Sequence, residues 1–155
     1  MPTTPDVTFS DDTTIRITRA IAAPPERVGR AWTDVTWFAR WFGQPHGTVP
    51  LETASMDARP GGTWSIVMHV GEMRLPFRGE FVEIAPHRIA MTLTDQPDDP
   101  AGASPLTVDL APTPDGGTLM TFVQISPSLG AAQLAQARDG WAGFFDALAG
   151  VVEAG

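Results

Sequence analysis

The side chains that could transfer a proton lie mostly in the middle of the chain, and they do not form a recognisable catalytic set. They are the carboxylates and guanidinium groups of Asp57, Arg59, Arg74, Arg78, Glu80 and Glu83. Arg78 and Glu80 share one strand parity, opposite Phe77 and Phe81, so an ion pair on the outer face of a sheet is favoured over a catalytic pair. The chain contains no Tyr, which removes a common general acid. The sequence therefore assigns no catalytic residue.

The sequence also lacks the residue patterns that usually bind metals or cofactors. The chain has no Cys and three histidines, His46, His69 and His87, none of which stands at metal-ligand spacing from another histidine or a carboxylate. There is no Gly-x-Ser-x-Gly nucleophile turn. The glycines of Arg59-Pro60-Gly61-Gly62 lack the Lys and the following helix of a phosphate-binding loop. We therefore expect neither a metal nor a cofactor.

Aromatic side chains are the stronger candidates for a binding site. Five Trp residues in 155 are more than a core of this size requires, and Trp joins an apolar ring to an N–H that can reach a ligand. Plain core packing is the alternative at each position. The expected ligand-binding residues are Trp41, Phe42, Trp64, Met68, Phe81, Met91, Trp141 and Phe145. Met68 and Met91 are the adaptable members, because Met fills irregular gaps.

A tight turn and a strand position the centre of this lining. Pro60-Gly61-Gly62 forms a corner, because Pro fixes φ and Gly enters positive φ without a Cβ clash. The strand that follows, about 62–71, places Trp64, Ile66 and Met68 on one face. That face is too apolar to meet water, so it must meet a core or a pocket.

Alternating and helical patterns predict the remaining elements. Further strands are expected near 13–22, 48–57, 74–84, 88–95, 105–111 and 118–126. Turn residues between successive strands favour antiparallel neighbours. Two short helices follow Pro24 and Asp34, and a long amphipathic helix is expected near 138–153. Gly140 and Gly143 each cost that helix about 1 kcal/mol relative to Ala, and close approach to the sheet is the expected compensation.

These elements predict an α+β chain in which a curved antiparallel sheet meets one long helix. The chain, 1–155, is expected to form a single domain with a flexible N-terminus at 1–12. A sheet that grips one helix leaves space between them for a small molecule. His46 and Arg59 are the polar residues expected at the mouth of this cavity. Arg19 falls on the apolar parity of the first strand, so it either reaches solvent at an edge or points a charge into the cavity.

Composition excludes several classes of partner. The formal net charge is −8, from 18 acidic and 10 basic side chains, and the basic residues are scattered arginines. This balance opposes binding to nucleic acid or to anionic membranes, which depends on clustered basic side chains. No apolar run approaches the ~20 residues of a membrane span, and the first residues lack the pattern of a signal peptide. A cytoplasmic protein is the expectation.

Five segments, spread in order over most of the chain, carry a family resemblance. They are Ile17-Thr18-Arg19-Ala20-Ile21 continuing into Ala23-Pro24, Arg30-Ala31-Trp32-Thr33-Asp34, Ala39-Arg40-Trp41-Phe42-Gly43, Asp57-Ala58-Arg59-Pro60-Gly61-Gly62-Thr63-Trp64, and Gly140-Trp141 before Phe145 and Leu148. Together they resemble the START-like, or SRPBCC, superfamily, and within it the branch of homologues of the activators of heat-shock-protein-90 ATPase. The family usually has a second Trp where this chain has Phe42, a change that keeps the aromatic volume.

The resemblance implies a helix-grip (START/Bet v-like) fold, with a curved antiparallel seven-stranded sheet around a long C-terminal helix and two short helices. It also implies an enclosed hydrophobic cavity, but no single activity, because relatives are described as ligand binders, co-chaperone-like modules or polyketide cyclases and dehydratases. The leading hypothesis is a small cytoplasmic protein that binds a hydrophobic molecule, whether aromatic, lipid-like or polyketide-like, in that cavity. The alternatives are a cyclase, dehydratase or hydrolase that uses the same cavity, and an interaction module that acts on a chaperone. Catalysis and formation of a homodimer stay open, and a chaperone partner has no support beyond the name of the branch.

Overall fold

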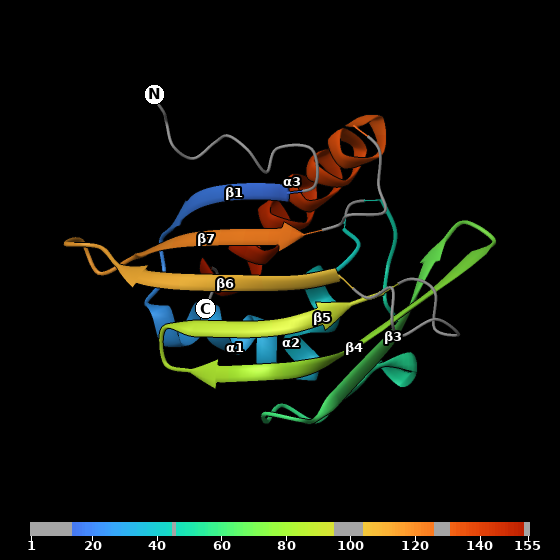
Figure 1. The fold of residues 1–155 in the computed structure, drawn as a ribbon, viewed down its shortest axis with the longest axis horizontal. Coiled ribbons are helices and arrows are strands. Elements are labelled where there is room, and N and C mark those ends of the chain that lie inside the picture. Colours follow the sequence, from blue (N-terminus) through green and yellow to red (C-terminus); the bar gives the residue numbers. More distant parts are fainter. Residues whose placement is uncertain (1–13, 45, 95–103, 126–130, 154–155) are drawn as a thin grey trace.

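One antiparallel sheet and one long helix account for most of the described chain (Figure 1). The computed structural model describes residues 14–44, 46–94, 104–125 and 131–153. In chain order the elements are β1 (Thr14–Ile21), α1 (Pro25–Thr33), α2 (Val35–Trp41), the 3-10 helix η2 (Leu51–Thr53), β2 (Ser55–Met56), β3 (Thr63–Val70), β4 (Met73–Ala85), β5 (Arg88–Leu93), β6 (Ser104–Pro112), β7 (Thr118–Ile125) and α3 (Ala131–Glu153).

The strands form a single seven-stranded sheet in the order β1-β7-β6-β5-β4-β3-β2, and every neighbouring pair is antiparallel. All three α-helices lie on one side of this sheet, with α3 behind β1 and β7 in Figure 1 and the short helices α1 and α2 behind β5 and β6. The hairpin of β3 and β4 runs diagonally away from the other strands. This arrangement confirms the predicted α+β helix-grip fold.

The face of the sheet that meets the helices carries the core, as strand alternation predicts. Val108 on β6 pairs with Phe122 on β7, and both side chains are fully buried. On β3, Trp64, Ile66 and Met68 are buried, with 1%, 1% and 7% of their surface exposed. The prediction of one apolar face on this strand is therefore confirmed, and we call the helix-covered side the inner face.

Two predicted boundaries differ from the structure. The long helix begins at Ala131, earlier than the predicted start, because Leu134 is buried against the same core as Trp141 two turns later. The predicted strand at 48–57 pairs with β3 over Ser55–Met56 and at an isolated bridge between Thr48 and His69, but not between them. The residues before it form η2, where the hydroxyl of Thr53 hydrogen-bonds the main chain of Val67 at 3.3 Å and so covers part of the edge of β3.

The contacts of α3 bear on two expectations, one about Gly140 and one about the charge of Arg19. A Cβ on Gly140 would meet no atom within 4 Å, so close approach to the sheet is wrong as an explanation for this glycine. Arg19 on β1 pairs with Asp146 on α3, and the two side chains are 34% and 71% exposed. Arg19 therefore ties an edge strand to the helix near the surface, and its charge is balanced there by Asp146.

The hydrogen-bonded ladder between β4 and β5 is interrupted near one end. It runs from Ala85 and Arg88 to Phe81 and Met91, with a bulge between Phe81 and Glu83, and it resumes only at the bridge between Arg78 and Thr94. At the interruption, the backbone amide of Glu80 donates to the hydroxyl of Thr92 at 3.0 Å. A side-chain hydroxyl therefore satisfies a backbone amide where the ladder bonds are missing.

Candidate functional site

Nine aromatic side chains, which we call the aromatic cluster, gather between the inner face of the sheet and the helices. The members are Trp32, Phe38, Trp41, Phe42, Trp64, Phe122, Trp141, Phe144 and Phe145. Two triplets at i, i+3 and i+4 supply most of the rings, one on α2 and one on α3, because this spacing places side chains on one face of a helix. Sequence spacing thus places the three rings of each triplet on one side of their helix.

Trp32, on α1, lies at the centre of the aromatic cluster and is fully buried. Its ring centroid is 4.9 Å from that of Trp41 and 6.0 Å from that of Phe145. It stacks with Phe122 at 6.2 Å and with Trp141 at 6.3 Å, so rings from the sheet and from α3 both meet this indole. These are ordinary distances for attractive ring pairs.

All eight predicted ligand-binding residues are buried, from 0% exposure at Trp41 and Phe145 to 7% at Met68. Five of them belong to the aromatic cluster. Met68 packs beneath Gly43, where a Cβ would lie 2.5 Å from the Met68 sulfur, and Phe81 pairs with Met91 across β4 and β5. The structure therefore places the eight residues in the core between the inner face and the helices, and their role in binding a ligand stays a prediction.

The indole N–H groups of the aromatic cluster differ in how they are satisfied. Trp41 donates to the carbonyl oxygen of Ala31 at 2.8 Å, and Trp141 donates to Oε1 of Gln124 at 2.8 Å. Trp64 donates to the carbonyl oxygen of Thr92 at 3.1 Å. The N–H of Trp32 is buried and has no hydrogen-bond partner in the described part of the chain. The site is therefore an apolar environment that contains one unpaired hydrogen-bond donor, the indole N–H of Trp32.

The two polar residues predicted at a cavity mouth lie away from the aromatic cluster. His46 is exposed after α2. Arg59 is also exposed, and its Nε donates to Asp57 at 2.8 Å within the turn before β3. Within the described residues no hydrogen bond, ion pair or ring contact joins either side chain to the aromatic cluster. Their proposed place beside a ligand stays a prediction.

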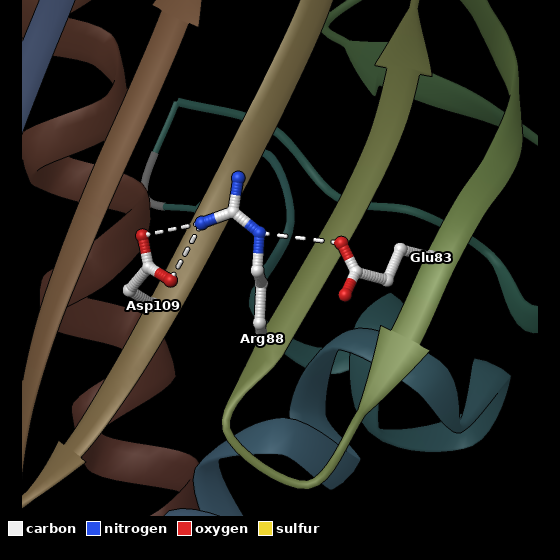
Figure 2. Close-up of polar contacts among 3 residues, drawn as sticks. All are labelled: Glu83, Arg88 and Asp109. Atoms are coloured by element: carbon white, nitrogen blue, oxygen red, sulfur yellow. Dashed lines mark hydrogen bonds and ion pairs between the residues drawn. The ribbon is translucent and has the colours of Figure 1, made fainter.

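Glu83, one of the candidates for proton transfer, is part of an ion-pair network on the outer face of the sheet (Figure 2). The Nη1 of Arg88 donates to both carboxylate oxygens of Asp109, at 2.8 and 3.0 Å, while its Nε donates to Glu83 at 3.3 Å. The hydrogen bond to Asp109 is the largest cause that raises the pKa of Arg88 above its ordinary value. These groups cross-link three strands, and they lie on the side opposite the aromatic cluster.

The described residues offer few groups for proton transfer in the core or for metal binding. Buried polar side chains among the described residues are Thr94, Thr118 and Gln124, none of which titrates. No group of three or more His, Cys, Asp or Glu residues in the described ranges could hold a metal ion. No described helix is long and apolar enough to cross a membrane.

A concave feature on the outer face of the sheet, which we call the outer groove, lies where the ladder between β4 and β5 is interrupted. It has a volume of about 430 Å³ and is lined by Ser55, Thr63, Trp64, Ser65, Arg78, Gly79, Glu80, Thr92 and Thr94. Hydroxyl and charged side chains predominate in this lining. Arg78 and Glu80 form no ion pair with each other in the structure, so the predicted pairing of these two residues is wrong.

Sequence reasoning missed three parts of these sites. The spacing of Val28, Ala31 and Trp32 already placed Trp32 on a buried helix face, but not at the centre of the rings. Gln124 shares strand parity with Phe122, which was a usable signal for its inward position. The outer groove depends on the interruption of the ladder between β4 and β5, for which the sequence offers no local pattern.

Comparison with known proteins agrees with this architecture. Residues 22–153 match the model of the family described as activator of Hsp90 ATPase homolog 1-like protein. Protein CV1439 from Chromobacterium violaceum is 30% identical in sequence, with a TM-score of 0.76, and the match covers 91% of this chain and 98% of that one. An AHSA1-like protein from Aeromonas hydrophila is 27% identical, with a TM-score of 0.73 and coverage of 91% and 92%.

A third solved structure shares the fold. Protein Ms6760 from Mycobacterium smegmatis is 24% identical, with a TM-score of 0.73, over 99% of this chain and 96% of that one. No curated protein matches the sequence. The family match covers most of the chain, and it spans both α2 and α3, which carry the aromatic triplets. The chain therefore belongs to the activator of Hsp90 ATPase homolog 1-like family, within the START-like (SRPBCC) superfamily.

Proposed function

We propose that this chain is a cytoplasmic START-like protein that binds an uncharged hydrophobic small molecule against the aromatic cluster. The predicted residues would contact that molecule: Trp41, Phe42, Trp64, Met68, Phe81, Met91, Trp141 and Phe145. Their ring faces suit an aromatic or polycyclic ligand, because offset and edge-to-face ring contacts are favourable. The absence of a buried titratable side chain among the described residues favours binding over proton transfer.

The buried indole N–H of Trp32 is the observation that carries this proposal. Leaving such a donor unpaired costs roughly 1–3 kcal/mol, because the group has lost its water and gained no partner. A ligand that offers a carbonyl or ether oxygen would recover part of that free energy. The expected ligand is therefore an apolar ring system that carries at least one hydrogen-bond acceptor.

Ligand entry requires a ring to move. Phe144 is the half-buried member of the aromatic cluster, and its centroid lies 5.1 Å from that of Phe42 and 5.4 Å from that of Trp141. Since these rings touch, a ligand would enter by displacing Phe144 from its neighbours and then packing against them. Binding should therefore be slower than diffusion allows, because it waits for this movement.

A matched pair of probes tests the proposal. 9-Fluorenone and fluorene have the same ring system, and only fluorenone carries a carbonyl acceptor. We expect both to raise the melting temperature and quench Trp emission, and fluorenone to bind about 2–10-fold more tightly, as one net hydrogen bond allows. Trp32→Phe should abolish that preference.

Trp37→Phe is the control variant. Trp37 lies outside the aromatic cluster, and the guanidinium groups of Arg27 and Arg30 lie 5.2 and 4.4 Å from its ring centroid. This variant should keep the preference for fluorenone. If neither probe changes the melting temperature or the emission of the wild-type protein, the proposed function is wrong.

A further inference from the structure

The outer groove lies on the outer face of the sheet, over a stretch where the hydrogen-bonded ladder between β4 and β5 is interrupted. Pairing of β4 with β5 stops after Phe81 and Met91 and resumes at Arg78 and Thr94. Between these points the hydroxyl of Thr92 accepts from the amide of Glu80. Side chains therefore replace ladder hydrogen bonds at this point, since the Thr92 hydroxyl accepts from the Glu80 amide and the Trp64 indole donates to the carbonyl oxygen of Thr92.

Gly79 lies at the floor of the outer groove and has no side chain to fill it. A Cβ at this position would collide with the carbonyl oxygen of Thr92 and would lie 2.7 Å from Nε1 of Trp64. Trp64 and Gly79 are cross-strand partners, and both line the groove. The floor is therefore set by close contact between backbone and an indole, and it has little freedom to collapse.

The walls of the outer groove are polar and come from four neighbouring strands. Ser55 on β2, Thr63 and Ser65 on β3, and Thr92 on β5 contribute hydroxyl groups. Hydroxyls both donate and accept hydrogen bonds, so this wall can satisfy several polar atoms of a ligand. The volume of about 430 Å³ falls within the usual range of small-molecule sites.

Two opposite charges stand over the outer groove without neutralising each other. Arg78 and Glu80 lie two residues apart on β4, which places both side chains on the same face. Neither side chain has a hydrogen bond or ion pair within the described part of the chain. A plain anion would meet the repulsion of Glu80 and of the net charge of −8, and a plain cation would meet Arg78.

We propose that the outer groove binds a small zwitterion of the amino-acid class. The ligand carboxylate pairs with the guanidinium of Arg78, and the ligand ammonium pairs with the carboxylate of Glu80. The hydroxyls of Thr63 and Ser65, which pair across from these two residues on β3, hold polar atoms of the ligand side chain. The charged and hydroxyl groups of this site lie on the outer face, and the site shares only Trp64 with the aromatic cluster, so the proposal does not rest on the function proposed above.

Titration of the ¹⁵N-labelled full chain, followed by amide chemical shifts in NMR, tests this proposal. The probes are L-alanine and L-glutamine, with propionate and ethylammonium as the two half-molecules of alanine. We expect saturable shifts at Thr63, Ser65, Gly79 and Glu80 with L-alanine and L-glutamine. Each half-molecule should bind about 10-fold more weakly, because it loses one charge-assisted contact.

Arg78→Gln and Glu80→Gln should each weaken binding of L-alanine by about 10-fold. Arg74→Gln is the matched control, since Arg74 lies on the same strand outside the outer groove and bonds the carbonyl oxygens of Gly71 and Met73. The spectra themselves show whether each variant is folded. No saturable shift in the groove, equal binding of a half-molecule, or unchanged affinity in Arg78→Gln would overturn the proposal, whatever the result with fluorenone.

Discussion

The indole Nε1 of Trp64 donates a hydrogen bond of 3.1 Å to the carbonyl oxygen of Thr92, and it passes directly over Gly79 to do so. This contact joins β3 to β5 across the strand that separates them. Trp64 therefore belongs to the aromatic cluster and, together with Gly79, also forms the floor of the outer groove. The geometry works only because the residue between the two partners has no side chain.

Gly79→Ala should therefore destabilise the protein by about 1–3 kcal/mol, as overpacking in a rigid site does. The new methyl group would meet the backbone of Thr92, which cannot rotate away as a long side chain can. Urea unfolding followed by far-UV circular dichroism measures the change. Relief of the strain by separation of β4 from β5 would also weaken the bond from Trp64, so the Trp emission of the folded variant should shift.

Gly140→Ala is the matched control for that prediction. A Cβ at Gly140 meets open space on α3, so the substitution should stabilise the protein by about 1 kcal/mol through helix propensity. Opposite signs for the two glycine substitutions are the expected result. Equal stability of Gly79→Ala and the wild type would show that β4 and β5 accommodate a methyl group at position 79. The close contact of Gly79 with Thr92 and Trp64 would then not restrict this position.

Much of the fold follows from local sequence patterns. Alternation placed Trp64, Ile66 and Met68 on one face of β3, and helical spacing placed Trp141 and Phe145 on one face of α3. Each inference needs only the period of its own element. The same periods predicted that these residues would be buried, because the two faces have to cover each other.

Contacts between elements were less accessible to sequence reasoning. Trp64 and Thr92 are 28 positions apart, and their contact depends on the register of β4 against β5, which a bulge beyond Phe81 shifts by one residue. The ion pair of Arg88 with Asp109 depends in the same way on the register of β5 against β6. Register arises from long-range pairing and turn geometry, which no single segment encodes.

Asp115, in the turn between β6 and β7, supports a prediction about acid stability. Its Oδ1 accepts hydrogen bonds from the hydroxyl of Thr113 and from the amide of Gly117, the latter at 3.2 Å. The bond from Thr113 is the largest cause that holds the pKa of Asp115 below its ordinary value of 3.8. A carboxylate with a depressed pKa in the folded state stabilises that state above the pKa of the unfolded chain.

This stabilisation is lost as the pH falls through the lower pKa of the folded state. Asp115→Asn should therefore reduce the decline of the melting temperature in acid, while it lowers the melting temperature near neutral pH. Asp139→Asn is the control, because Asp139 is an exposed residue of α3 without a partner among the described residues. A steeper acid decline in Asp115→Asn than in the wild type would contradict the assignment.

Two fully buried tryptophans allow the unused donor to be tested without any ligand. Trp32 and Trp41 are both completely buried, and their centroids lie 4.9 Å apart, so Phe at either position removes a similar volume from the same core. They differ in the N–H, since that of Trp41 reaches the carbonyl oxygen of Ala31 and that of Trp32 has no partner in the described chain.

Trp41→Phe should therefore be the more destabilising by about 1 kcal/mol or more, because it also breaks a buried hydrogen bond. Urea unfolding of the two variants in parallel measures this difference. Equal losses would mean that the Trp32 donor is already satisfied in the free protein, and a ligand acceptor would then gain nothing at this position.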